Sequence, residues 1–245
     1  MIYRQELGDR KLFYLVSGLV LVFITIAIPI ELNGKWIALL WSGEAALLFW
    51  IGRNKEVPFY EKLAYPLILL AIISLGTLWL TATGFWFYAG ETEYRSPILN
   101  ATFLTGILVT IALGFINYIH QKPVYHAARF GRSDGIRNVL TVGLAGLFVL
   151  VLYNIFRMEI DLYWSQLYEA SAVERTPEEG GYTYNTYNLD LFNFNGIWQL
   201  NYTLFFVTVL AFFNIKKLKS TSLGWVNLAL IGIVLIGFLT GGIFT

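Results

Sequence analysis

Apolar residues along this chain come in long unbroken runs rather than in the amphipathic or alternating patterns of soluble proteins. A helix rises about 1.5 Å per residue, so about 20 apolar residues cross a hydrocarbon core of about 30 Å. Seven stretches reach or approach that length. They predict membrane-spanning helices at residues 12–30, 36–52, 64–83, 98–119, 138–156, 200–215 and 222–243. The expected fold is therefore an all-α integral membrane protein, a single transmembrane domain over residues 1–245.

The composition supports the membrane class. Hydrophobic residues make up 57% of the chain and charged residues 13%, whereas about a quarter of the residues in soluble proteins are charged. The first apolar run is too long for the core of a signal peptide and is interpreted as a retained helix. The chain has no cysteine, which excludes disulfides, iron–sulfur clusters and thiolate zinc sites. No cofactor is predicted.

The basic residues predict the orientation in the membrane. Thirteen of the 17 lie in the N-terminal segment and in alternate connections between the predicted spans. By the positive-inside rule, the N-terminus is cytoplasmic and the C-terminus is outside. The acids follow the reverse pattern, with five inside and ten outside, and Glu44 alone lies within a span. The net charge of +1 gives no argument for a nucleic-acid partner.

One stretch carries a resemblance to a known family. Residues 27–53 read AIPIELNGKWIALLWSGEAALLFWIGR, in which a proline precedes a turn with Gly-x-Trp, followed by an apolar helix with Trp-x-x-Glu and a basic end. The positions are Pro29, Gly34, Trp36, Trp41, Glu44 and Arg53. This pattern resembles a segment of the bacterial domain of unknown function 2339 family. The resemblance implies a multi-pass protein of the bacterial inner (cytoplasmic) membrane, a helical bundle and no stated activity. Members of that family are longer, so we expect a fragment or a short relative.

Glu44 is the first candidate functional residue, because its span places it close to the middle of the bilayer. An ionised carboxylate there costs several kcal/mol, so the group must be protonated, reach water or find hydrogen-bond donors. No Lys, Arg or His lies in any predicted span, so no buried ion pair is expected. Trp41 shares the helix face of Glu44. The predicted hydroxyl partners at similar depth are Ser74, Thr110 and Thr208. Glu44 is either a proton or solute relay, or a neutral acid that links two helices.

The segment 157–199 is predicted as an outer loop that is acidic and rich in aromatic residues. Apolar positions from 160 to 167 have helical spacing, which would let this part lie along the membrane surface. The loop either binds a sugar or a cation, or it anchors itself at the interface with an aromatic belt. Its candidate residues are Glu159, Asp161, Tyr163, Trp164 and Glu169.

No catalytic motif is present, and no catalytic residue is predicted. His120 and His126 lack a third nearby ligand, so no metal site is predicted. Three functions remain as hypotheses. The first is a non-catalytic envelope component, embedded in the lipid bilayer, that assembles as a homo-oligomer or with other envelope proteins. The second is a proton-linked transporter or channel that uses Glu44. The third is a membrane enzyme acting on a lipid-linked glycan, with Glu159, Asp161 and Glu169 as its acids.

Overall fold

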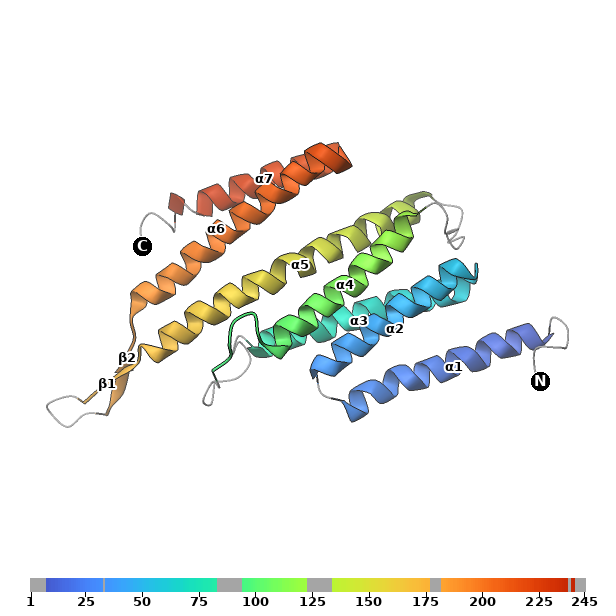
Figure 1. Ribbon diagram of the computed structural model, residues 1–245, viewed down its shortest axis with the longest axis horizontal. Helices are drawn as coiled ribbons and strands as arrows, with labels where there is room; N and C mark the ends of the chain where they lie inside the picture. The colour runs from blue at the N-terminus through green and yellow to red at the C-terminus, as the bar shows by residue number, and fades with distance from the viewer. Residues whose placement is uncertain are drawn as a thin grey trace. The chain divides into compact units, whose positions relative to one another are not determined.

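The computed structural model describes residues 8–32, 34–82, 94–122, 134–176, 182–237 and 239–240. These residues form seven α-helices and one short β-hairpin (Figure 1). The predicted helical class is confirmed, and each predicted span lies largely within one helix. The helices are α1 (Gly8–Glu31), α2 (Gly34–Asn54), α3 (Pro58–Ala82), α4 (Ala101–Gln121), α5 (Asp134–Ala170), α6 (Leu189–Phe213) and α7 (Thr221–Gly237), with a π-helical turn, η2 (Asn214–Leu218), after α6.

Within the described part of the chain, four helical segments are long and apolar enough to cross a membrane. They are Pro58–Thr81, Ala101–Gln121, Asn138–Ala170 and Leu189–Leu218. Two shorter apolar helices cover Val16–Ala27 and Leu223–Gly237. Large apolar side chains lie exposed on α1, α6 and α7, including Phe23, Phe212 and Ile233. Hydrocarbon is a suitable surrounding for such faces, because water around so much apolar surface would be unfavourable.

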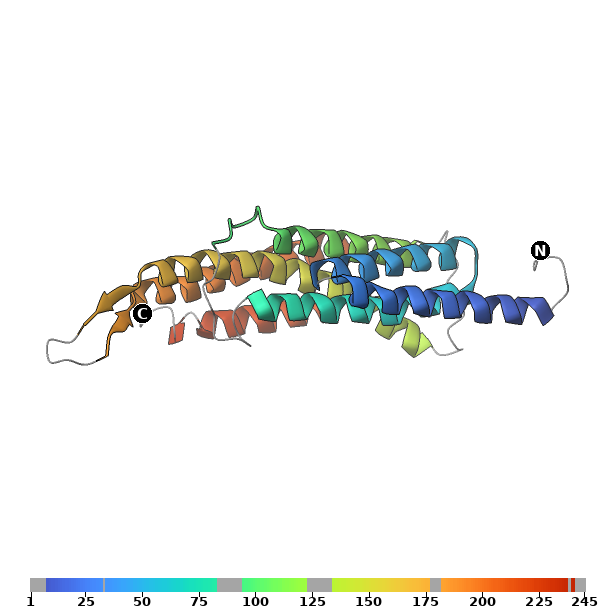
Figure 2. The same ribbon diagram turned by 90° about the horizontal axis from the view of Figure 1, so that it is seen from below.

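The chain falls into two compact units, which are described one at a time. The N-terminal unit comprises Met1–Glu91 and Asn100–Leu152, and it contains α1 to α4 and the first part of α5. In it α2, α3 and α4 run side by side (Figures 1 and 2). Their common core contains Ala38, Ala45 and Phe49 of α2, Ala64, Ile68, Ala71 and Leu75 of α3, and Val109, Leu113 and Ile116 of α4. Small buried residues recur every three to four positions on α2, at Ala38, Ser42 and Ala45, and seven positions apart on α3, at Ala64 and Ala71, which brings the two helix backbones close together.

Local sequence explains where these helices begin and end. Pro58 is the first residue of α3, a position where its missing N–H costs no hydrogen bond. Asn100 is the N-cap of α4, and its side chain accepts a hydrogen bond from the backbone N–H of Phe103. The predicted span 98–119 therefore starts too early, because Ile98 to Asn100 precede the helix.

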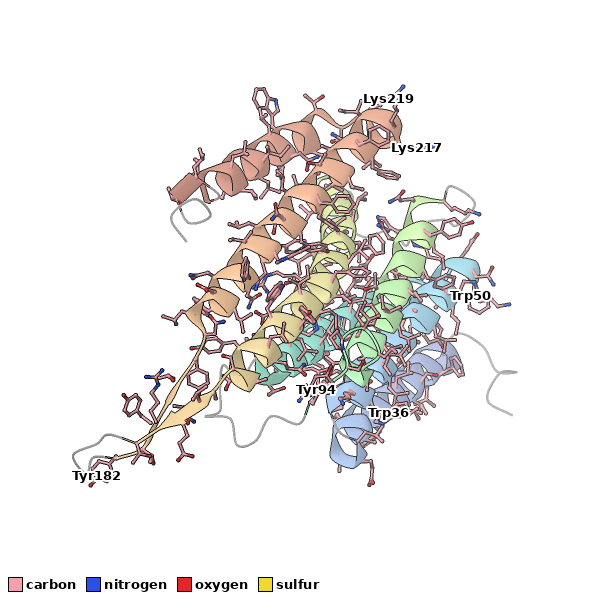
Figure 3. All side chains as sticks on the ribbon, turned by 60° about the vertical axis from the view of Figure 1, so that its left-hand side comes forward. Trp36, Trp50, Tyr94, Tyr182, Lys217 and Lys219 are labelled. Atoms are coloured by element: carbon pink, nitrogen blue, oxygen red, sulfur yellow. The ribbon has the colours of Figure 1, made fainter. Side chains whose placement is uncertain are left out.

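The C-terminal unit comprises Thr92–Leu99 and Tyr153–Thr245. The second half of α5 contacts α6 through side-chain hydrogen bonds, and α7 folds back along α6 (Figure 1). Beyond α5 and before α6, strands β1 (Val173–Arg175) and β2 (Tyr184–Thr186) form an antiparallel hairpin, with Glu174 opposite Asn185. Figure 3 shows Tyr182 near the tip of this hairpin, and it shows Lys217 and Lys219 at the other end of α6.

The structure corrects the prediction that residues 157–199 form a loop. Most of it is helix: α5 continues to Ala170, and α6 begins at Leu189. The apolar positions 160–167, expected to form a separate surface helix, lie within α5. The physical reason is that no glycine or proline occurs between Gly146 and Pro177, so nothing in the sequence ends the helix at the predicted boundary.

Candidate functional site

Glu44 lies between α2 and α1 and is half-buried. Its two carboxyl oxygens are 3.2 and 3.3 Å from the hydroxyl of Thr25 on α1. One turn earlier on α2, the indole N–H of Trp41 donates a 3.1 Å hydrogen bond to the backbone carbonyl of Thr25. The predicted common face of Trp41 and Glu44 is therefore confirmed, and both side chains bind the same residue. This face points toward α1, whereas the core face of α2 carries Ala38, Ser42 and Ala45.

The Thr25 hydroxyl has only one proton, and it has two neighbours. It lies 2.9 Å from the backbone carbonyl of Leu21, which can only accept, as well as close to Glu44. When the proton goes to Leu21, the Thr25 oxygen presents lone pairs to the carboxyl group. A protonated Glu44 can then donate to that oxygen, so that each of the three groups makes a hydrogen bond. The geometry fits a neutral acid that joins α1 to α2.

The predicted hydroxyl partners of Glu44 donate to other acceptors in the structure. Ser74 donates to the backbone carbonyl of Gly34 at 3.4 Å. Thr110 and Thr208 donate to carbonyls one turn earlier in their own helices, those of Gly106 and Leu204. A membrane helix satisfies its hydroxyls most easily in this way, because the carbonyl four residues earlier is always within reach. Depth in the bilayer was thus an insufficient criterion, since it does not specify which helices are neighbours.

A buried ion pair joins α2 to α3 at the turn between them. Nη2 of Arg53, in the last turn of α2, donates a 2.8 Å hydrogen bond to Oε1 of Glu61 in the first turn of α3. The two side chains are only 3% and 1% exposed. Tyr65, one turn further along α3, donates to the same carboxyl oxygen at 3.2 Å. The expectation that no buried ion pair forms is therefore wrong, because these residues lie at helix ends that pack into the core.

At the turn between α2 and α3, the backbones of the two helices approach each other closely. A Cβ atom added to Gly52 would lie 2.6 Å from the backbone nitrogen of Glu61, so only glycine fits. Val57 N–H donates to the carbonyl of Gly52, and Glu56 between them adopts a left-handed φ of 55°. The first residues of α3 are thereby held against the last turn of α2, with Arg53 and Glu61 facing each other.

His120 connects two further helices, α4 and α5, to this pair. Nδ1 of His120, in the last turn of α4, lies 2.9 Å from Nη2 of Arg53, and Nε2 of His120 lies 2.9 Å from the hydroxyl of Thr141 on α5. The ring of Phe49 lies 5.2 Å from the Arg53 guanidinium carbon, close enough for a cation–π contact. We call Arg53, Glu61, Tyr65 and His120 the charged cluster. In the sequence, the charged cluster corresponds to a basic residue and an acid eight positions apart across a short turn. That pattern is too common to predict that the two side chains are buried.

The predicted outer candidates lie on the second half of α5, in the C-terminal unit. Oδ1 of Asp161 accepts hydrogen bonds from the side-chain amides of Asn195 and Gln199 on α6, at 2.8 and 3.0 Å. Oε2 of Glu159, whose residue is 8% exposed, accepts a 2.6 Å bond from the backbone N–H of Ile98. Glu169 is exposed near the end of α5. The structure thus gives Glu159 and Asp161 different partners and does not bring them together as a pair.

Aromatic rings pack in layers along the same α5–α6 pair. Trp164 lies 5.6 Å from Phe194 and 6.4 Å from Trp198, and it makes an edge contact with Tyr163 at 5.4 Å. Tyr168 stacks on Tyr187 at 4.9 Å near the β-hairpin. These ring contacts stabilise the helix pair, and Tyr163, Phe194 and Trp198 remain about half exposed.

An open groove of about 510 Å³ lies between the start of α2 and the end of α3. It is lined by Gly34, Lys35, Trp36, Thr77, Leu78 and Thr81. Both threonine hydroxyls donate to carbonyls of α3 itself. Among the described residues, no group of three or more His, Asp or Glu side chains is arranged to hold a metal ion. His126 lies outside the described residues.

Comparisons of this chain with protein-family models, with curated proteins and with solved structures give no match.

Proposed function

We propose that this chain is a seven-span protein of the bacterial cytoplasmic membrane, without catalytic activity, that assembles with copies of itself or with other envelope proteins. The observation that carries the proposal is the use of the buried and half-buried acids. Glu44 bonds to α1, Glu61 to α2, and Asp161 to α6, each from a different helix. Acids used in this way link helices and are not presented to a substrate.

The seven-span arrangement is supported by the match between the seven helices and the seven apolar stretches. The N-terminus-inside orientation is supported by the basic residues. Figure 3 shows Trp36 and Trp50 at opposite ends of α2, as expected of interfacial tryptophans at the two membrane surfaces. The bacterial location is supported by the resemblance of residues 27–53 to the domain of unknown function 2339 family.

The topology can be tested with single cysteines, because the chain has none of its own. Tyr182→Cys and Lys35→Cys should react with a membrane-impermeant maleimide added to intact cells, whereas Lys55→Cys and Lys217→Cys should react only after lysis. All four side chains are exposed, so burial does not prevent the reaction. Reaction of Lys217→Cys in intact cells would contradict the proposed orientation.

Assembly is tested on the full chain in lipid nanodiscs and in native membranes. Covalent cross-linking followed by mass spectrometry should identify a specific neighbour, either a second copy or another membrane protein. Quantitative recovery of an uncrosslinked monomer at native expression levels would contradict the assembly proposal.

A proton-linked transport function is the second candidate. The observation that favours it is that Glu44 lies outside the tightly packed core of α2, α3 and α4, against α1. Infrared spectroscopy of the carboxyl stretch in nanodiscs distinguishes the two functions, with Glu44→Gln assigning the band. A band that exchanges with D₂O and titrates near neutral pH favours transport. A protonated band that exchanges slowly favours the helix link.

The glycan enzyme is the least supported function. General acid and base catalysis needs two carboxyl groups within reach of one bond. Glu159 and Asp161 are two positions apart on α5, which places them about 200° apart around the helix axis. Their different hydrogen-bond partners agree with that separation.

A further inference from the structure

The charged cluster fixes the protonation state of His120. An arginine guanidinium has only donors, so the Nδ1 atom that it contacts at 2.9 Å must be an unprotonated acceptor. The ring proton is then on Nε2, which donates to the hydroxyl of Thr141. The contacts therefore require a neutral imidazole in the Nε2–H tautomer.

The groups around His120 come from three other helices of the N-terminal unit. Helix α2 contributes Arg53 and the ring of Phe49, which lies 6.2 Å from the imidazole. Helix α5 contributes Thr141 directly, and α3 contributes Glu61 and Tyr65 through the bonds of Glu61 to Arg53 and of Tyr65 to Glu61. The charge of Arg53 is balanced by Glu61, whose Oε1 already accepts from both Arg53 and Tyr65. Among the described residues, the cation nearest to the His120 ring is therefore Arg53, which also donates a hydrogen bond to that ring.

We propose that His120 is a pH-sensitive switch that connects the last turn of α4 to the turn between α2 and α3. Proton uptake at Nδ1 removes the lone pair that accepts from Arg53 and places two N–H groups and two positive charges face to face. The contact cannot survive that change, so the ring must leave Arg53. Because the same ring bonds to Thr141, the start of α5 loses its link to the cluster in the same step.

The pH range and the direction follow from the chemistry. Histidine is the side chain whose ordinary titration lies between about pH 5 and 8. The closed arrangement binds only the neutral ring, so it is favoured at higher pH and is lost as the pH falls. In the proposed orientation the cluster lies at the cytoplasmic surface, and the switch would respond to acidification of the cytoplasm.

The tautomer is tested first, by ¹⁵N NMR of histidine-labelled protein in nanodiscs. The chain has only two histidines, so His126→Gln leaves His120 as the single labelled ring. At about pH 7.5 we expect an unprotonated Nδ1 signal and a protonated Nε2 signal, and at about pH 5.5 both nitrogens protonated. An Nδ1–H tautomer at the higher pH, or a ring that stays neutral at the lower one, overturns the proposal.

The movement is tested with spin labels on Asn54→Cys and Gln121→Cys, two exposed positions at the ends of α2 and α4. We expect a second, longer distance population when the pH falls from about 7.5 to about 5.5. In a His120→Asn background the amide can accept from Arg53 but cannot titrate, so the distances should not depend on pH. An unchanged distance in the His120 protein, or the same pH response in His120→Asn, overturns the proposal. The NMR measurement needs no change at His120 and so decides the matter if that variant does not fold.

Discussion

Arg53 and Glu61 are joined by a 2.8 Å hydrogen bond, and both side chains are almost completely buried at the turn between α2 and α3. Removing two charges from water is costly, and the pair recovers that cost only while both partners are present. Nε of Arg53 is buried and has no hydrogen-bond partner among the described residues, so the arrangement is not optimised for stability alone. The pair specifies that the end of α2 meets the start of α3. His120 contacts the guanidinium group of the same arginine, Arg53.

Replacing Arg53 by methionine leaves the Glu61 carboxylate buried without its cation. We expect Arg53→Met to lower the free energy of unfolding by about 3–5 kcal/mol, as found when one partner of a buried pair is removed. The measurement is SDS-induced unfolding of the protein in mixed micelles. Lys55→Met is the matched control, because it removes an exposed charge from the same turn and should change stability by less than about 1 kcal/mol. The double variant Arg53→Met/Glu61→Leu should regain much of the loss, and equal instability of the single and double variants would contradict this account.

Gly52 allows the backbones of α2 and α3 to approach. Gly52→Ala places a methyl group against the backbone nitrogen of Glu61, which cannot move aside as a flexible side chain could. We expect a loss of several kcal/mol, larger than the usual overpacking cost of about 1–3 kcal/mol. Gly43→Ala, on the same helix with no atom within 4 Å of the added methyl, should be neutral or slightly stabilising. Both variants are compared by thermal unfolding in nanodiscs, and similar melting temperatures would show that the turn adapts.

The sequence predicted the helices better than the contacts between them. Long apolar runs indicate where helices form, because the bilayer requires every backbone group to be paired internally. They do not indicate which face of each helix meets which neighbour. Glu44 illustrates this limit, since its helix and its shared face with Trp41 were predicted correctly but its partner was Thr25 on α1. Arg53 illustrates a second limit, because a basic residue at the end of a predicted span is equally consistent with an exposed residue that sets the orientation in the membrane.

The Glu44 link should tolerate a neutral substitute. Glu44→Gln keeps a donor toward the Thr25 hydroxyl, so we expect a change of less than about 1 kcal/mol, whereas Glu44→Leu should cost about 1–2 kcal/mol through the lost interhelix bond. Thr25→Val should have the same effect as Glu44→Leu, and the two together should not be additive. The measurement is a double-mutant cycle by SDS unfolding. A large loss in Glu44→Gln would show that the ionised carboxylate is required.

Ile98 adopts a left-handed φ of 66°, which a β-branched residue rarely does, while its N–H donates to Glu159. Its side chain is 58% exposed, so replacing it by glycine removes little packing and relieves the backbone. Relief of about 1–3 kcal/mol should exceed the entropy cost of glycine, about 0.5–1 kcal/mol, so Ile98→Gly should raise the melting temperature. Leu99→Gly is the control, because Leu99 is 86% exposed and has no positive φ, so only the entropy cost applies and the melting temperature should fall slightly. If both variants lowered the melting temperature equally, packing of the Ile98 side chain would fix the backbone at residue 98. The hydrogen bond to Glu159 would then be a consequence of that packing.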